Sequence, residues 1–200
     1  ILVCLVGSEM CIRDSYDGPV MILVDKLSAS ASEILAGAFQ DYKRGLIVGS
    51  STFGKGTVQR LENLSYGQLK FTEQKFYRVS GKSTQNMGVI PDVNLPFVFD
   101  SDEIGEVTLE NSLPYDDISS VEFEPFISNS NIEMIQSFSK KRVSDSNLNE
   151  YIESQKIHNK REMDKKLIPV NYQLRKSEKA SQEEKRLFIE NRFRVSVGLK

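Results

Sequence analysis

Two short apolar runs in the first fifty residues have the pattern of buried strands. Residues 19–24 (PVMILV) are apolar and are bounded by Gly18 and Asp25, which is typical of a strand covered on both faces. Residues 46–48 (LIV) form a second run that opens into the polar, glycine-rich turn at residues 49–56.

Between these strands the apolar residues recur at near-helical spacing. Ser30 stands three positions before Glu33, the signature of a capping box, in which each side chain satisfies a backbone N–H group at a helix start. We therefore predict a helix that begins near Ser30. Its apolar positions are Ile34, Leu35, Ala38 and Phe39.

Residues 57–79 predict a pair of extended strands. Spaced Val, Leu, Phe and Tyr residues lie on both sides of Tyr66 and Gly67, so a hairpin that turns at this pair is the simplest arrangement. Residues 89–93 (VIPDV) resemble a final edge segment, because Pro91 cannot donate a hydrogen bond within a sheet.

The last third of the chain is rich in Lys, Glu, Gln, Asn and Ser. Segments 131–166 and 177–194 carry spaced apolar residues in this charged background, which predicts amphipathic helices. The change in composition near residue 100 favours two regions. We assign 16–100 to an α/β region, 131–200 to a helical region and 101–130 to a connecting segment.

Residues 1–15 have a separate origin by our interpretation. Residues 5–14 (LVGSEMCIRD) match, in one reading frame, the translated transposon adapter of sequencing libraries, and Ser15 completes the match. We treat residues 1–15 as an artefact and exclude them from the fold. Because Cys4 and Cys11 both fall here, the remaining chain has no cysteine for a disulfide, a thiolate nucleophile or a zinc site.

Charge and hydropathy narrow the possible partners. The net charge of −2 is too small to predict a nucleic-acid or acidic-substrate partner. No stretch reaches the apolar length that spans a bilayer.

A serine nucleophile in this chain needs a base other than histidine. The single histidine, His158, lies in the charged helical region, where an exposed helix residue is the simpler interpretation. Lysine is the natural alternative, because desolvation favours its neutral form, which can accept a hydroxyl proton.

The turn T-F-G-K-G supplies such a lysine, Lys55, between two glycines that let other backbone approach closely. The candidate nucleophile is Ser30, since a helix N-terminus offers partial positive charge and free N–H groups where an oxyanion forms. Ser28 and Ser32 compete with it, and a plain N-cap is the alternative role for Ser30.

The same turn also fits the first seven positions of a phosphate-binding loop, G-x-x-x-x-G-K, from Gly49 to Lys55. The eighth position is Gly56, where the motif requires a hydroxyl for magnesium. The following residues are extended in pattern, whereas a phosphate loop opens a helix. Nucleotide binding is therefore a minor alternative.

The residues now carry a family resemblance. Residues 23–59 (LVDKLSASASEILAGAFQDYKRGLIVGSSTFGKGTVQ) resemble the active-site stretch of the C-terminal processing peptidases, family S41, in its bacterial tail-specific branch. The likeness continues through 74–93 (QKFYRVSGKSTQNMGVIPDV), 110–118 (ENSLPYDDI) and 167–179 (LIPVNYQLRKSEK). It covers nearly all of residues 16–194.

The resemblance implies roles for five residues. The middle serine of S-A-S-A-S-E, Ser30, is the nucleophile, and the lysine of F-G-K-G, Lys55, is its general base. Gln59 matches a position that holds this lysine in place, and Asp41 matches one sometimes assigned to the charge relay. The backbone N–H of Ala31 is an oxyanion donor, while the second donor lies in a glycine-rich loop upstream.

Expected backbone distances bear on two of these roles, those of Gln59 and Asp41. Lys55 and Gln59 would lie about 13 Å apart on a regular strand, so contact requires a turn or bulge near Gly56; a strand-surface residue is the alternative. Ser30 and Asp41 are about 16 Å apart along one unbroken helix. We therefore favour a helix-end or structural carboxylate at Asp41.

The resemblance also implies the second half of a ClpP/crotonase-like α/β serine protease core, followed by a helical extension that packs on the core or contacts a partner. It implies protein substrates with apolar C-terminal tails, an upstream PDZ domain, a possible adaptor protein and a periplasmic location. No metal, organic cofactor or nucleic acid is implied. A catalytically inactive scaffold of the same fold is the other alternative.

Overall fold

A computed structural model describes residues 16, 18–99, 104–126, 131–144 and 147–199. The adapter interpretation of residues 1–15 lies outside the described residues. The elements in chain order are β1 (Met21–Val24), α2 (Ala31–Asp41), β2 (Leu46–Gly49), β3 (Thr57–Asn63), β4 (Gln68–Lys75), β5 (Val93–Asn94), the 3-10 helix η1 (Glu106–Thr108), α3 (Ile132–Ser144), α4 (Leu148–Met163) and α5 (Tyr172–Ser196).

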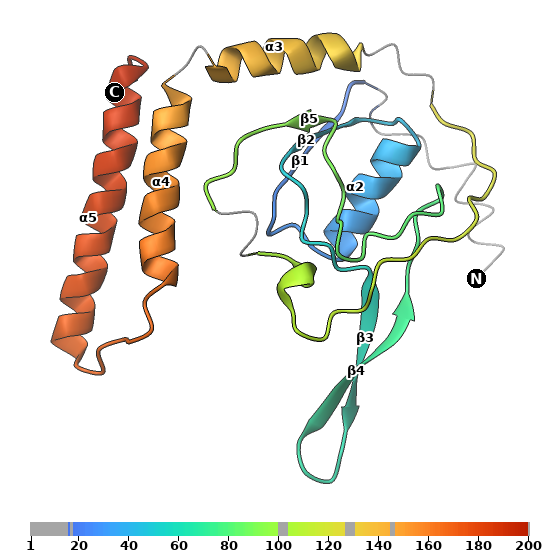
Figure 1. Cartoon of the computed structure of the whole chain (residues 1–200), viewed down its shortest axis with the longest axis horizontal. Helices are drawn as coiled ribbons and strands as arrows, with labels where there is room; N and C mark the ends of the chain where they lie inside the picture. Colours follow the sequence, from blue (N-terminus) through green and yellow to red (C-terminus); the bar gives the residue numbers. More distant parts are fainter. Residues whose placement is uncertain (1–15, 17, 100–103, 127–130, 145–146, 200) are drawn as a thin grey trace.

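A small parallel sheet organises the first half of the chain (Figure 1). Its strand order is β1-β2-β5, with Met21 opposite Leu46 and Val48 opposite Val93. Parallel neighbours need a crossover connection, and α2 provides it between β1 and β2. Both strands predicted before residue 50 are confirmed. Of the predicted edge segment 89–93 only Val93 lies in a strand, the two-residue β5.

The core between α2 and the sheet consists of Val24, Ala36, Ile47 and Val89, with Ile22 and Phe39 packed against it. The predicted helix is confirmed, with Ser30 as its N-cap. Not all of its predicted apolar positions face the core, because the side chains of Ile34 and Leu35 are 49% and 53% exposed. The buried side of α2 instead carries Glu33, Ala36 and Gly37.

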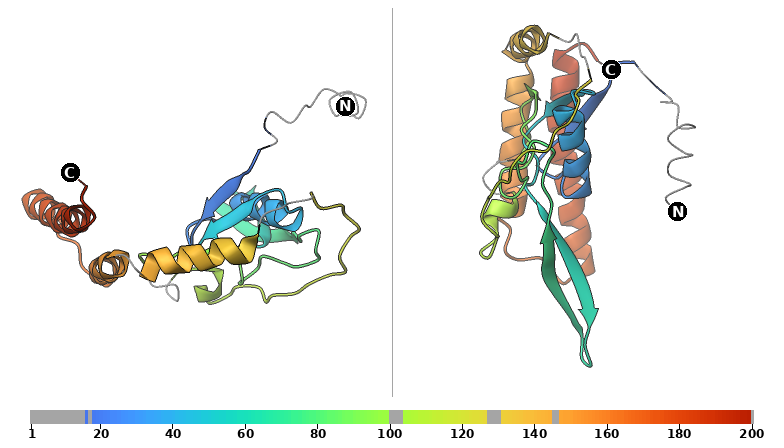
Figure 2. Two further views of the ribbon diagram at one scale, coloured as in Figure 1. Left: turned by 90° about the horizontal axis from the view of Figure 1, so that it is seen from above. Right: turned by 90° about the vertical axis from the view of Figure 1, so that its right-hand side faces the viewer.

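The predicted hairpin is confirmed as β3 and β4, which project away from the sheet (Figure 2). Leu64 N–H donates to the carbonyl of Gly67 at 3.1 Å and closes the turn. The strand pairing ends at Lys75 rather than near residue 79, and its register shifts between Val58 and Gln59. This register shift lies just after Gly56, where a contact between Lys55 and Gln59 would require a turn or bulge.

The helical region contains three helices in its described part. The predicted helical segment 131–166 contains two helices, α3 and α4, and α5 begins at Tyr172 rather than at residue 177. The cause of the earlier start is Asn171, whose side chain accepts hydrogen bonds from the N–H groups of Gln173 and Leu174. The helices α4 and α5 run antiparallel, with the rings of Tyr151 and Phe193 stacked at 4.6 Å (Figure 1).

Segment 104–126, predicted as a connection, lies along the sheet half of the molecule and bonds to it repeatedly. Its N–H groups donate to the carbonyls of Phe53, Gly81, Val79 and Tyr42 at 2.8 to 3.0 Å. The donors are Glu106, Ile118, Val121 and Phe126. The segment is thus hydrogen-bonded into the first half of the molecule, even though it contains little regular secondary structure.

Candidate active site

Ser30 occupies a strained backbone position at the start of α2. Its φ and ψ are 57° and −115°, a region that side-chain-bearing residues seldom adopt and that is concentrated at functional sites. Its N–H donates to Glu33 Oε2 at 2.8 Å, which completes the predicted capping pair. Of the competing serines, Ser28 has its hydroxyl bonded to Asp25, and Ser32 is exposed within the first helical turn.

Glu33 is fully buried, and its carboxylate accepts four hydrogen bonds. Oε1 accepts from the Thr52 hydroxyl at 2.5 Å and from Gly54 N–H at 2.7 Å. Oε2 accepts from the N–H groups of both Ser30 and Lys55, at 2.8 and 2.9 Å. Four donors and the positive end of α2 compensate the desolvation of this carboxylate. One oxygen atom thereby ties together the backbones of the two residues that the sequence singled out.

The turn around Lys55 has an acceptor for every N–H from Phe53 to Gly56. Phe53 N–H donates to the Ser28 carbonyl at 2.9 Å, and Gly56 N–H donates to Gln85 Oε1 at 3.0 Å. Both glycines are required by close approach: a Cβ on Gly54, where φ is 95°, would lie 2.9 Å from backbone of residue 86, and one on Gly56 would lie 2.7 Å from Gln85 N. The glycines flanking Lys55 thus admit the chain at residues 85–86.

The Lys55 side chain is half-buried. Between these two described residues, no hydrogen bond joins the Ser30 hydroxyl to the Lys55 ammonium. Gln59 is exposed on β3, and its side chain makes no hydrogen bond to Lys55 within the described chain. Ala31 N–H, at the first position of α2, has no acceptor among the described residues and faces no intrahelical partner.

Asp41 lies at the opposite end of α2 from Ser30. Arg78 donates to both its oxygens, at 2.9 Å from Nε and 2.5 Å from Nη2, and the Ser80 hydroxyl adds a bond at 3.1 Å. The side chains of Asp41 and Arg78 are 9% and 13% exposed. The carboxylate therefore joins the end of the helix to the chain that follows β4.

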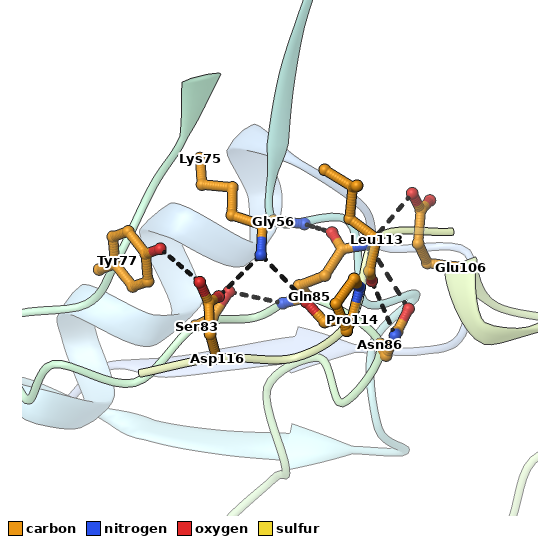
Figure 3. A network of polar contacts seen from close by, with 10 residues as sticks. All are labelled: Gly56, Lys75, Tyr77, Ser83, Gln85, Asn86, Glu106, Leu113, Pro114 and Asp116. Atoms are coloured by element: carbon orange, nitrogen blue, oxygen red, sulfur yellow. Dashed lines mark hydrogen bonds and ion pairs between the residues drawn. The ribbon is translucent and has the colours of Figure 1, made fainter. Parts of the chain in front are cut away.

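A second polar cluster connects the Lys55 turn with segment 104–126 (Figure 3). Gln85 bridges Gly56 to the Leu113 carbonyl, and Lys75 forms an ion pair with Asp116 at 2.8 Å. Lys75, followed by the Tyr77 hydroxyl, holds the pKa of Asp116 below its ordinary range. The hydrogen bond to Asp116 in turn raises the pKa of Tyr77.

The remaining candidates lie elsewhere or lack the required surroundings. His158 is on α4, in the helical pair away from α2 (Figure 1). In the described ranges, no group of three or more His, Cys, Asp or Glu residues is arranged to hold a metal ion. The residues after Gly56 form β3, so the helix that a phosphate-binding loop requires is missing there. None of the helices in the described parts combines the length and apolar character needed to cross a bilayer.

Two residues of the site were not assigned by sequence reasoning. The sequence predicts only a capping role for Glu33, because its long-range partners at residues 52–55 leave no local signal. Gln85 was not recognised, because one amide among many polar residues at 80–86 gives no sign of complete burial. The only available hint was the pair of glycines around Lys55, which signalled that some other backbone comes close.

Comparison with known proteins places these features in a family. The model of peptidase family S41 matches residues 7–95, and the model of the C-terminal domain of tail-specific protease (DUF3340) matches residues 99–200.

Named relatives agree with the two family models. The chain is 38% identical over 186 residues to the tail-specific protease of Haemophilus influenzae, covering 86% of this chain and 27% of that protein. It is 46% identical over 76 residues to the carboxy-terminal-processing protease of Bartonella bacilliformis, covering 38% of this chain and 18% of that protein.

A solved structure titled photosystem II D1 C-terminal processing protease is 46% identical over 38% of this chain and 20% of its own, with a TM-score of 0.35. The chain thus spans about a quarter or less of these proteins' lengths. Since the two family models account for nearly all of its residues, the chain belongs to peptidase family S41 and carries the C-terminal domain of the tail-specific proteases.

Proposed function

We propose that this chain forms the nucleophile-bearing part of a serine endopeptidase that uses a Ser30–Lys55 dyad. In this proposal residues 16–100 are the second half of a ClpP/crotonase-like α/β core, and residues 131–200 are its helical extension. The catalytic unit also requires protein segments that supply the substrate-binding domain and the second oxyanion donor.

The observation that carries the proposal is the shared acceptor at Glu33. Because Glu33 Oε2 accepts from the N–H groups of both Ser30 and Lys55, the two backbones are held within the combined length of two hydrogen bonds. The strained φ of Ser30 adds support, since such backbone persists only where the surroundings enforce it.

The chemistry follows from this placement. The Ser30 oxygen attacks the carbonyl carbon of a peptide bond while its proton passes to the Lys55 amine. The tetrahedral intermediate collapses, the C–N bond breaks, and the leaving amine takes that proton from Lys55. Water then attacks the acyl-enzyme with Lys55 again as base, which releases the new carboxylate and restores Ser30.

Three further residues have assigned roles in the proposal. The unpaired N–H of Ala31 donates to the developing oxyanion. Gln59 orients Lys55 after a rearrangement of its exposed side chain, for which the register shift at Val58 provides local freedom. Asp41 has a structural role, since Arg78 and Ser80 occupy its carboxylate.

The substrates that we propose are proteins recognised by apolar C-terminal tails, in the bacterial periplasm, with an adaptor protein as a possible partner. The names of the relatives support the part of this proposal that concerns the tails of protein substrates, since one is a tail-specific protease and the other is a carboxy-terminal-processing protease. No metal or organic cofactor takes part.

The test uses the protein expressed with its complete coding sequence. Ser30→Ala and Lys55→Ala should each reduce cleavage of a tailed protein by at least about a thousandfold, because the two residues act as one unit. Both variants should still bind the tailed substrate. Near-full activity of Lys55→Ala would refute the dyad.

A non-catalytic scaffold of the same fold is the competing function. It is favoured by the missing hydrogen bond between the Ser30 hydroxyl and the Lys55 ammonium. A fluorophosphonate reagent distinguishes the two functions, because only an activated Ser30 is labelled. Labelling of wild type but not of Ser30→Ala supports the peptidase, and no labelling of either supports the scaffold.

A further inference from the structure

Gln85 is a fully buried amide that bridges two parts of the chain (Figure 3). Its Oε1 accepts from Gly56 N–H at 3.0 Å, and its Nε2 donates to the Leu113 carbonyl at 3.0 Å. The same Nε2 lies 3.5 Å from a carboxylate oxygen of Glu106. A side-chain amide is suited to this place, because it offers an acceptor on one side and donors on the other.

The contact with Gly56 acts directly on the backbone of Lys55. The N–H of Lys55 belongs to the peptide plane before its Cα, and the N–H of Gly56 belongs to the plane after it. Glu33 holds the first plane and Gln85 holds the second. Together the two side chains fix both backbone dihedrals of Lys55, and therefore the direction in which its side chain leaves the turn.

The other side of the bridge lies in segment 104–126. Glu106 and Leu113 fall within the residues matched by the C-terminal domain of tail-specific protease, whereas Lys55 falls within the matched peptidase region. Glu106 adds a second attachment to the same turn, because its N–H donates to the Phe53 carbonyl at 2.9 Å. The Lys55 turn is thus held jointly by residues of both matched regions.

We propose that Gln85 is a positioning residue for Lys55, and that it makes the first segment of the C-terminal domain part of the framework that aims Lys55 at Ser30. This inference rests on the proposed dyad. It assigns to the C-terminal domain a role in turnover that is separate from substrate recognition.

The test compares Gln85 variants in the protein expressed with its complete coding sequence. Gln85→Met keeps the length of the side chain but removes both polar contacts. Gln85→Glu keeps the acceptor for Gly56, and its protonated form, which the adjacent Glu106 carboxylate and Leu113 carbonyl favour, can still donate to Leu113. The kcat per folded molecule should fall roughly 10- to 100-fold for Gln85→Met, and less for Gln85→Glu, as expected for a misplaced catalytic group. KM should stay within about twofold of wild type.

Asp116→Asn is the matched control. It removes the ion pair with Lys75 and changes the acceptor of the Tyr77 hydroxyl, and neither of these contacts involves residues 53–56. Its kcat should remain within about twofold of wild type, because neither contact of Asp116 holds the backbone of Lys55. An equal loss of kcat in Asp116→Asn and Gln85→Met would overturn the proposal, because the loss would then not depend on the contacts of Gln85 with the Lys55 turn.

The remaining outcomes are also decisive. Unchanged kcat per folded molecule in both Gln85 variants would show that the bridge only stabilises the fold. If Gln85→Met fails to fold, Gln85→Glu decides, and failure of both to fold assigns Gln85 a structural role and refutes the proposal. Ser30→Ala and Lys55→Ala are measured in the same assay. If these two variants remain active, the proposed dyad is wrong. If they are inactive while both Gln85 variants keep the wild-type kcat, only the positioning role of Gln85 is refuted.

Discussion

At the scale of single residues, the Glu33 carboxylate accepts four hydrogen bonds in the candidate site. A buried carboxylate is costly unless hydrogen bonds compensate it, and here three N–H groups and one hydroxyl converge on two oxygens. The strained backbone of Ser30, which costs on the order of 1–3 kcal/mol, is held by one of these bonds. Replacement of the Glu33 side chain should therefore affect both the stability of the protein and its proposed catalysis.

We predict that Glu33→Gln destabilises the protein by about 2–4 kcal/mol and lowers kcat at least about tenfold. The amide nitrogen would face N–H donors where the wild type presents an oxygen. Urea unfolding and steady-state kinetics measure the two effects. Glu62→Gln, on the exposed strand β3, is the control and should change stability by less than about 0.5 kcal/mol. Equal effects of the two variants would contradict the prediction.

A second prediction at this scale concerns the titration of Asp116 and Tyr77. Because the pKa of Asp116 is lowered in the folded protein, its contribution to stability is present above about pH 4, the ordinary aspartate value, and is lost as the pH falls through the lowered value. Because the pKa of Tyr77 is raised, its contribution is present below about pH 10 and is lost as the pH rises through the raised value.

Carbon-13 NMR of the Asp116 carboxyl and of the Tyr77 ring checks both directions. Asp116→Asn should return the titration of Tyr77 toward that of an ordinary tyrosine, because its hydrogen bond to Asp116 is the largest cause of the shift. An Asp116 carboxyl that titrates at or above the ordinary aspartate value would contradict the assignment.

At the scale of elements, α2 is fixed at both ends by charged side chains. Glu33 binds its first turn to the Lys55 turn, and Asp41 binds its last residue to Arg78. These two polar anchors set the rotation of the helix about its axis. This explains why Ile34 and Leu35 point outward although their spacing suggested a core-facing stripe.

We predict that the Asp41–Arg78 pair contributes to stability through mutual dependence. Arg78→Met should cost about 3 kcal/mol, because it leaves a mostly buried carboxylate without its partner. Asp41→Asn combined with Arg78→Met should cost less than the sum of the single changes, with a coupling of about 1–3 kcal/mol in a double-mutant cycle. Coupling near zero would show that the pair is not a structural anchor.

At the scale of the whole molecule, the local elements could be predicted from the sequence and their long-range contacts could not. Hydrophobic runs, the capping pair at Ser30 and the turn at Gly67 are local signals, so β1, α2, β2 and the hairpin were predicted close to their observed bounds. The early start of α5 depends on Asn171, whose capping role competes with other polar residues nearby.

The candidate site follows the same rule. The sequence singled out Ser30 and Lys55 because motif and resemblance lie in contiguous residues. The roles of Glu33 and Gln85 depend on bonds across 22 and 29 positions, which a single sequence does not encode visibly.

The bridge at Gln85 has a consequence for biosynthesis. A polypeptide emerging from the ribosome has no Leu113 carbonyl for Gln85 until synthesis has passed that position, well beyond both Ser30 and Lys55. Until then the lysine turn lacks one of its two anchoring sides, so the backbone around Lys55 can reach its final geometry only after residue 113 has been synthesised.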